Sequence, residues 1–377
     1  MQADISKEDI LYMERALQLA QLGTIAVRPN PFVGAVVVKN HTIVGEGWHQ
    51  KAGGPHAEIW ALQDAGEAAR DATLYVTLEP CSHYGKTPPC TQAIITAGIK
   101  RVVCACCDPF TKVNGKGIKI LEEAGIEVVC GVCEEKARKI NRGFFRSIEQ
   151  KRPQVIAKMA ATLDGKTATV AGESQWITGK EARHDVQRLR SLTDAITVGI
   201  NTVLADDPHL TVRDFSRPKQ PWRVIWDKTA RLPLTATIVT QLPERTILFC
   251  TQEAAPNRLE ALRQQGVNVE LLSCNAEGEP DIRAGIKLLL EKYEIQTVLL
   301  EGGATLIDAF LRAALLDEIY LYIAPLMFGG AMAKGISAGA GIEALQNAPR
   351  YTLIDTQMFA DDIRLHYEVK EFGCLQV

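Results

Sequence analysis

The feature that most constrains the fold is an alternation of short apolar runs and amphipathic stretches, which stops at residues 150–153 and then starts again. Alternating strands and helices predict an α/β layer fold in each half. The joining segment is polar and ends in proline, which is typical of a boundary between domains. A chain of 377 residues can bury two such cores. We therefore expect one domain over residues 1–150 and a second over 151–377.

In the first half, Ser6 and Asp9 resemble a helix N-cap, followed by apolar residues at helical spacing up to Gly23. Five strands are expected after it, because runs of apolar and β-branched residues are bounded by turn signals. The expected strands cover 33–39, 42–47, 73–78, 101–106 and 127–130, and the further helices cover 56–65, 89–97, 117–124 and 134–148.

In the second half, Thr178 is expected to cap a helix over 180–192, with Glu181 completing a capping box. Six further apolar runs predict strands, and the stretches between them predict helices. These strands cover 155–161, 195–199, 223–226, 246–250, 268–271 and 297–300, and the helices include 281–292 and 304–314.

The composition limits the class of protein. A net charge of −3 provides no strong basic field for a nucleic-acid backbone, so nucleic acid is not expected as a partner. The N-terminal segment is acidic where a signal peptide would be basic, and we find no apolar run of about 18 residues that could span a membrane. Ten cysteines in a chain of this length do not indicate a disulfide scaffold. We therefore expect a cytoplasmic protein with reduced thiols and no membrane partner.

One set of residues in the first half has the pattern of a catalytic zinc site. Such a site needs three protein ligands and leaves one position open for water, and His56, Cys81 and Cys90 supply three suitable ligands. Glu58 follows His56 at a spacing that suits a proton shuttle for zinc-dependent deamination of a nucleobase-like ring. Residues two apart lie on different faces of a helix, so His56 and Glu58 can converge only where a helix begins. The alternative is a buried histidine with structural cysteines, and the order of two Pro-Cys pairs downstream favours the metal site.

The other cysteines of this half have simpler interpretations. Cys104, Cys106 and Cys107 are assigned to a predicted buried strand and are expected in the core. Cys130 and Cys133 have the spacing of a redox motif, yet nothing like a thioredoxin context surrounds them. A second metal or redox site there is the less favoured alternative.

The second half has a candidate phosphate site. Glu301, Gly302 and Gly303 follow a predicted strand and precede a predicted helix, where glycines let a phosphate approach the helix N-terminus. This is less than the full dinucleotide fingerprint, and a simple tight turn is the alternative. Arg190 and Arg213 would suit a phosphate through their guanidinium forks, with ordinary surface charges as the alternative.

Taken together, the motifs resemble those of the bifunctional riboflavin-biosynthesis deaminase/reductase family. Eight residues separate Cys81 from Cys90, whereas cytidine and tRNA-adenosine deaminases usually have two between their cysteines. The resemblance extends over the whole chain. The motifs that carry it are 28–34, 45–49, 54–58 and 79–90 in the first half and 158–166, 172–178, 199–213 and 301–303 in the second.

The resemblance implies both a fold and an activity. It implies a cytidine-deaminase-like three-layer domain followed by a dihydrofolate-reductase-like α/β domain. The first would use one zinc ion to deaminate a phosphoribosylaminopyrimidine, and the second would use NADPH to reduce its ribosyl group to a ribityl chain. The family also assembles as dimers or larger homo-oligomers.

Individual site residues follow from the same resemblance. His56, Cys81 and Cys90 would bind zinc, Glu58 would be the catalytic proton shuttle, and Asn30 and His49 would contact substrate, with His83 and Lys86 able to reach its phosphate. In the second half, NADPH contacts are implied for Ala160, Trp176, Thr202, Asp206, Gly303, Ala304, Thr305 and Leu306. Substrate contacts are implied for Ser174, Arg190, Leu210, Arg213 and Glu301. Lys158 and Asp206 are candidates for polar assistance, and Lys228 stands where the family often has a small polar residue.

Two other functions remain as alternatives. A nucleic-acid deaminase acting on tRNA adenosine or on cytidine, with an accessory domain, would show deamination of tRNA or single-stranded DNA. A non-enzymatic zinc module would hold its ion with four protein ligands. The charge, the long insert between the cysteines and the complete second set of motifs argue against the nucleic-acid deaminase. Glu58 and the open fourth ligand position argue against the zinc module.

Overall fold

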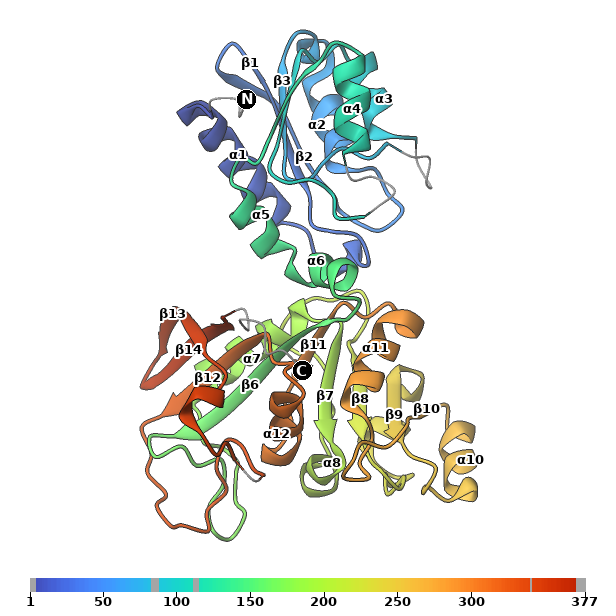
Figure 1. The fold of residues 1–377 in the computed structure, drawn as a ribbon, viewed down its shortest axis with the longest axis vertical. Helices are drawn as coiled ribbons and strands as arrows, with labels where there is room; N and C mark the ends of the chain where they lie inside the picture. Colours follow the sequence, from blue (N-terminus) through green and yellow to red (C-terminus); the bar gives the residue numbers. More distant parts are fainter. Residues whose placement is uncertain (1–4, 83–87, 111–114, 340, 371–377) are drawn as a thin grey trace. The chain divides into compact units, whose positions relative to one another are not determined.

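The computed structural model describes residues 5–82, 88–110, 115–339 and 341–370. The chain divides into two compact units, Met1–Lys151 and Arg152–Val377 (Figure 1). The helices of the described residues include none long and apolar enough to cross a membrane.

The first unit contains a five-stranded sheet in the order β2-β1-β3-β4-β5. Strand β1 is antiparallel to both β2 and β3, whereas β3, β4 and β5 are parallel. The carboxyl ends of these three parallel strands therefore lie at one edge of the sheet. The strands are β1 (Gly34–Lys39), β2 (Thr42–Trp48), β3 (Thr73–Val76), β4 (Arg101–Cys104) and β5 (Glu127–Cys130).

Helices cover both faces of this sheet, which gives the unit three layers (Figure 1). Because successive side chains of a strand point to opposite faces, Val36 packs toward α1 and Val37 packs toward α2. A Cβ at Gly47 would lie 2.5 Å from the Ala57 carbonyl oxygen, so this glycine lets the start of α2 approach β2 closely. The helical segments are α1 (Lys7–Ala20), η1 (Ile25–Val27), α2 (Ala57–Ala65), η2 (Gly66–Ala69), α3 (Cys90–Thr96), α4 (Lys116–Glu123), α5 (Glu134–Ile140) and α6 (Arg142–Glu149).

The helix predicted over 134–148 is in fact two helices, α5 and α6, so that prediction was wrong. Asn141 lies between them with φ −111° and ψ 24°. Its side-chain oxygen accepts a hydrogen bond from the Phe32 amide, and its side-chain nitrogen donates to the Phe32 carbonyl, both at 2.7 Å. This tertiary contact interrupts the helix, and the local helical pattern does not contain it.

The second unit contains a nine-stranded sheet in the order β10-β9-β8-β7-β11-β6-β12-β14-β13. The first seven strands in this order are parallel, and β14 and β13 extend the sheet in the antiparallel sense. The strands are β6 (Gln154–Thr162), β7 (Ala195–Gly199), β8 (Trp222–Trp226), β9 (Thr246–Cys250), β10 (Asn268–Leu271), β11 (Thr297–Leu300), β12 (Glu318–Ala324), β13 (Tyr351–Phe359) and β14 (Asp362–Val369).

Helices α11 and α12 pack on one face of this sheet, and α7, α9 and α10 contribute to the cores on the other face. The carboxyl ends of β6, β11 and β7 lie side by side at one edge, where open α/β sheets commonly bind ligands. The helical segments are α7 (Lys180–Leu192), α8 (Ile200–Asp206), α9 (Thr237–Thr240), η3 (Pro243–Arg245), α10 (Pro256–Gln264), α11 (Ile282–Tyr293), α12 (Ala304–Arg312) and η4 (Leu345–Asn347).

The cap predicted for α7 was also wrong. The N-cap residue is Gly179, and no side chain of the cap accepts a hydrogen bond from the first turn. Instead, the Gly179 amide donates to a carboxylate oxygen of Asp362 at 2.7 Å. A residue at the start of β14 therefore takes the role that the sequence pattern assigned to Thr178.

Candidate active sites

Three potential metal ligands meet at the carboxyl edge of the first sheet. His56 is the N-cap of α2, Cys90 is the first residue of α3, and Cys81 lies in the segment after β3. Their ligand atoms all lie within 4.8 Å of one another. The Nδ1 atom of His56 is 3.6 Å from the Cys81 sulfur and 3.2 Å from the Cys90 sulfur.

These distances fit a zinc ion. Tetrahedral coordination with ordinary Zn–N and Zn–S bond lengths separates the nitrogen and sulfur ligands by about 3.6 Å. The Cys81 sulfur also accepts a hydrogen bond from the Cys90 amide at 3.2 Å. Hydrogen bonding by Cys90 and then by His56 lowers the pKa of Cys81 to about 4, and the hydrogen bond with Cys81 together with burial raises the pKa of Cys90. Cys81 is therefore the thiolate of the pair, and Cys90 would lose its proton on binding a metal. The three side chains therefore form a donor set that suits zinc and leaves a fourth position for another ligand.

Glu58 lies in the first turn of α2, beside this donor set, and only 3% of it is exposed. Burial raises the pKa of its carboxyl group, although interaction with His56 opposes the shift. A carboxyl group with a raised pKa can accept and return a proton near neutral pH. The helix begins between His56 and Glu58, at the position that their spacing predicts.

His49 and Asn30 form a second layer around the first site. The His49 Nδ1 atom lies 3.0 Å from the Pro55 carbonyl, and the Asn30 side-chain nitrogen lies 3.1 Å from His49 Nε2. This pattern fixes a neutral imidazole with its proton on Nδ1. Burial lowers the pKa of His49 and reinforces the neutral form. Its ring packs edge-on against the His56 ring, with the ring centres 5.3 Å apart.

Glu79 is a site residue that the sequence analysis did not single out. Its buried carboxylate accepts hydrogen bonds from the backbone amides of Asp108, Gly115 and Gly117, at 3.2, 3.0 and 2.9 Å. It thereby ties the segment that leads to Cys81 to the loops after β4 and before α4. A carboxylate at the end of an apolar strand, directly before a Pro-Cys pair, was the signal that could have revealed it.

We expect Glu79→Ala to weaken zinc retention by about 10- to 100-fold, the range found when groups that orient metal ligands are removed. Three backbone amides lose their acceptor, so the segment carrying Cys81 is no longer fixed. Competition with a chromophoric chelator measures the change, and Glu123→Ala on the exposed surface of α4 is the control. Unchanged zinc affinity in the Glu79 variant would show that this carboxylate does not position the ligand.

The second unit contains a nearly buried ion pair at the carboxyl edge of its sheet. Arg190 of α7 donates from Nε and from one terminal nitrogen to the two oxygens of Glu301, at 2.6 and 2.9 Å. Its other terminal nitrogen donates to the Thr211 carbonyl at 3.0 Å. Lys158 of β6 lies close enough to interact with both charges, although burial lowers its pKa. The pair orders two side chains that the sequence analysis assigned separately to substrate binding.

The start of α12 forms an open backbone cradle beside this ion pair. Gly303 is the N-cap of α12 and is exposed. A Cβ at Gly302 would lie 2.9 Å from a Leu306 methyl carbon, and one at Gly303 would lie 3.9 Å from the Thr202 hydroxyl. Thr202, Gly303 and Leu306 are therefore brought together, with Ala304 and Thr305 in the same helical turn.

The remaining predicted residues lie in loops and strands around this edge. The Gln175 side-chain amide donates a hydrogen bond to the Asp206 carboxylate at 3.2 Å. The Arg183 guanidinium lies 4.6 Å from the centre of the exposed Trp176 ring. Leu210 is buried with a positive φ of 49°. Ser174 and Arg213 are exposed, and the Arg213 backbone amide donates a hydrogen bond to the Gln187 side chain. Ala160 of β6 pairs with Tyr322 of β12. Lys228 forms an ion pair with Glu253 at 3.0 Å. His83 and Lys86 lie outside the described residues.

A three-layer unit with a His-Cys-Cys centre and a buried glutamate defines the class of a zinc-dependent deaminase, which is joined here to a second, largely parallel α/β unit. Comparisons with known proteins agree. The family model for the cytidine and deoxycytidylate deaminase zinc-binding region matches residues 6–106, and the model for the RibD C-terminal domain matches residues 153–365. The chain belongs to the RibD family of bifunctional riboflavin-biosynthesis enzymes.

Similar proteins support the assignment over nearly the full length. The riboflavin biosynthesis protein RibD of Aquifex aeolicus is 44% identical, with 97% of this chain and 99% of the relative covered. The Escherichia coli protein is 42% identical, with 95% and 99% covered. The solved structure of Acinetobacter baumannii RibD (form 1) superposes with a TM-score of 0.87 at 42% identity, covering 97% of this chain and 99% of that one. The predicted fold class and the deaminase-plus-reductase activity are confirmed, and the nucleic-acid deaminase is the less well supported function.

Proposed function

We propose that the chain carries out two successive reactions on one small molecule. The first unit hydrolyses an amino group of 2,5-diamino-6-(5-phosphoribosylamino)pyrimidin-4(3H)-one. The second unit then uses NADPH to reduce the ribosyl group, which gives 5-amino-6-(5-phosphoribitylamino)uracil. A similar structure, 35% identical with a TM-score of 0.84, is that of the diaminohydroxyphosphoribosylaminopyrimidine deaminase/5-amino-6-(5-phosphoribosylamino)uracil reductase of Thermotoga maritima.

In the first reaction, Glu58 is the proton shuttle. A zinc ion held by His56, Cys81 and Cys90 would supply an activated water. The buried Glu58 carboxylate is placed to take a proton from a water at the open position and to deliver it to the leaving amine. Asn30 and His49, which is fixed as a neutral imidazole, would orient the pyrimidine by hydrogen bonding.

In the second reaction, the residues of the sheet edge bind and orient the reactants. NADPH supplies the hydride. The N-terminus of α12 offers backbone amides to a phosphate, and Thr202 lies beside it. The remaining cofactor contacts are assigned to Ala160, Trp176 and Asp206. Glu301 would orient ribose hydroxyls while Arg190 holds its carboxylate, and Lys158 is a candidate for polar assistance nearby. The remaining substrate contacts are assigned to Ser174, Leu210 and Arg213.

The same proposal includes the remaining expectations for the chain. The net charge of −3 and the resemblance support a small-molecule substrate rather than a nucleic acid. The resemblance also supports a homo-oligomer, either a dimer or a tetramer, and a cytoplasmic location. Residues 1–150 would carry the deaminase and residues 151–377 the reductase.

The observation that carries the proposal is the His56, Cys81 and Cys90 donor set with Glu58 buried beside it, in one chain with the Arg190–Glu301 pair. Product masses test it in the zinc-loaded protein. Without NADPH, the diamino-pyrimidinone substrate should gain about 1 Da and release ammonia. Addition of NADPH should then add about 2 Da. Reduction without prior ammonia release, or no reaction of either kind, would contradict the proposal.

A further inference from the structure

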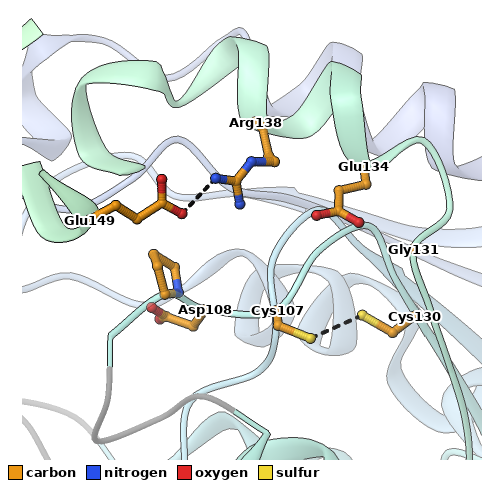
Figure 2. A pocket seen from close by; sticks show the side chains of 8 residues that line it. Cys107, Asp108, Cys130, Gly131, Glu134, Arg138 and Glu149 are labelled. Carbon is orange, nitrogen blue, oxygen red and sulfur yellow. Dashed lines mark hydrogen bonds and ion pairs between the residues drawn. The ribbon is translucent and has the colours of Figure 1, made fainter. Parts of the chain in front are cut away.

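Cys107 and Cys130 of the first unit are both exposed and face each other, so the expectation that Cys107 lies in the core was wrong. Cys107 lies just after β4, and Cys130 is the last residue of the neighbouring parallel strand β5. Their sulfur atoms are 3.5 Å apart, and Figure 2 shows the two side chains pointing toward each other. The spacing of Cys130 and Cys133 in the sequence suggested a different pair, whereas the structure places Cys130 against Cys107.

A pocket of about 320 Å³ opens directly onto this pair. Besides the two cysteines, its wall includes the carboxylates Asp108, Glu134 and Glu149 and the guanidinium of Arg138. Arg138 and Glu149 form an ion pair at 2.5 Å. The pocket is large enough to admit a molecule as small as hydrogen peroxide to the two sulfurs.

We propose that Cys107 and Cys130 are a dithiol site that a small hydroperoxide, such as hydrogen peroxide, oxidises reversibly to a disulfide. The two sulfurs have to approach by roughly 1.5 Å to reach disulfide bonding distance. Cys107 lies outside the β4–β5 ladder, and Cys130 is the last residue of it, paired with Cys104. A shift of the Cys107 side chain therefore brings the sulfurs together without a break in the β4–β5 pairing.

The two sulfurs have different roles in this reaction. Hydrogen bonding, by Cys104 first and then by Cys107 and the Gly131 amide, lowers the pKa of Cys130 to about 7. Burial, the hydrogen bond to Cys130 and the proximity of its charge raise the pKa of Cys107 to about 12. Cys130 is therefore the thiolate that attacks, and Cys107 stays protonated until the second step.

The chemistry balances with one peroxide. The Cys130 thiolate attacks one peroxide oxygen, the O–O bond breaks, and the products are a sulfenic acid on Cys130 and a hydroxide ion. The Cys107 sulfur then attacks the Cys130 sulfur and displaces its hydroxyl group, and the Cys107 proton ends in water. Overall, two thiols and one hydrogen peroxide give one disulfide and two waters. A dithiol reductant reverses the change by thiol–disulfide exchange.

The test uses the zinc-loaded full-length protein in which Cys274 and Cys374 are replaced by serine, so that fewer other thiols compete. Treatment with one equivalent of hydrogen peroxide should lower the intact mass by about 2 Da, and peptide mapping should place the bond between Cys107 and Cys130. Dithiothreitol should restore the mass. Cys107→Ser should prevent the bond and leave a sulfenic acid on Cys130 that dimedone captures, whereas Cys133→Ser should behave like the parent.

Two further rate measurements test the roles of the Cys130 thiolate and of the pocket. The rate of disulfide formation should rise about tenfold between pH 6 and pH 8, because the thiolate is the reactive species. Glutathione disulfide, which is much bulkier than hydrogen peroxide, should react more slowly at a pocket of about 320 Å³. A bond between Cys130 and Cys133, oxidation confined to Cys81 and Cys90 with release of zinc, or dimedone capture that is independent of Cys107 would each overturn the proposal.

Discussion

Replacement of Glu58 by glutamine is expected to abolish detectable ammonia release while the reduction of pre-deaminated substrate continues at its normal rate. Glutamine keeps the size of the side chain but cannot take up and return a proton. Loss of a general acid–base group costs about 10²- to 10⁴-fold in rate. The second unit forms its own compact core, so its reaction should not depend on this carboxylate.

Ammonia release by the purified, zinc-loaded variant measures this effect, and NADPH consumption with the deaminated intermediate measures the other half. Glu67→Gln, at an exposed position of η2, is the matched control. Zinc content should be equal in all three proteins, because Glu58 is not part of the donor set. Ammonia release by Glu58→Gln within a few-fold of the parent rate would show that another group moves the proton.

Replacement of Arg190 by alanine is expected to remove the reductase activity and leave the deaminase intact. The change leaves the Glu301 carboxylate, whose side chain is 10% exposed, without the fork that holds it. Truncation of one partner of such a pair corresponds to a loss of about 30-fold or more. Arg190→Lys should rescue poorly, since an ammonium group cannot reproduce the bidentate geometry. Reductase kcat/KM is the measurement, with the exposed Arg283→Ala as control.

The same pair allows a structural role to be separated from a functional one. Arg190→Ala should lower the free energy of unfolding of the second unit by about 3–5 kcal/mol, because it leaves a buried charge unpaired. The double variant Arg190→Met with Glu301→Leu should recover most of that stability, since apolar side chains can replace a buried pair. It should remain inactive as a reductase. Recovery of activity together with stability would contradict a direct role for the pair at the substrate.

The sequence was most informative where the chain is apolar and regular. Strands β7, β9, β10 and β11 begin and end at the predicted residues. Most of these strands are largely buried in a parallel sheet, so they read as continuous apolar runs. Strand β13 (Tyr351–Phe359) was not predicted, because it is an edge strand with mostly exposed or half-buried side chains and no apolar run. The division of α5 from α6 was missed because the Phe32–Asn141 contact joins residues far apart in the sequence.

For the site residues, too, local sequence patterns were informative, whereas contacts between distant residues could not be predicted. The zinc ligands and Glu58 could be proposed from sequence because their chemistry depends on residue type, order and short spacing. The pairing of Arg190 with Glu301 joins positions 111 residues apart, and the hydrogen bonds of Glu79 reach from 29 to 38 residues along the chain. Cys130 likewise faces Cys107 across two strands rather than its neighbour Cys133. Such contacts depend on which strands lie side by side, which local patterns do not specify.

The central claim is that one chain carries two separate active sites that act in sequence. The most direct test mixes the Glu58→Gln and Arg190→Ala variants with the diamino-pyrimidinone substrate, zinc and NADPH. Each variant alone should consume no NADPH with this substrate, and the mixture should consume it after a lag while the deaminated intermediate accumulates. If the mixture stays inactive although each variant retains its own half-reaction, or if either variant alone completes the conversion, the two-site account is wrong.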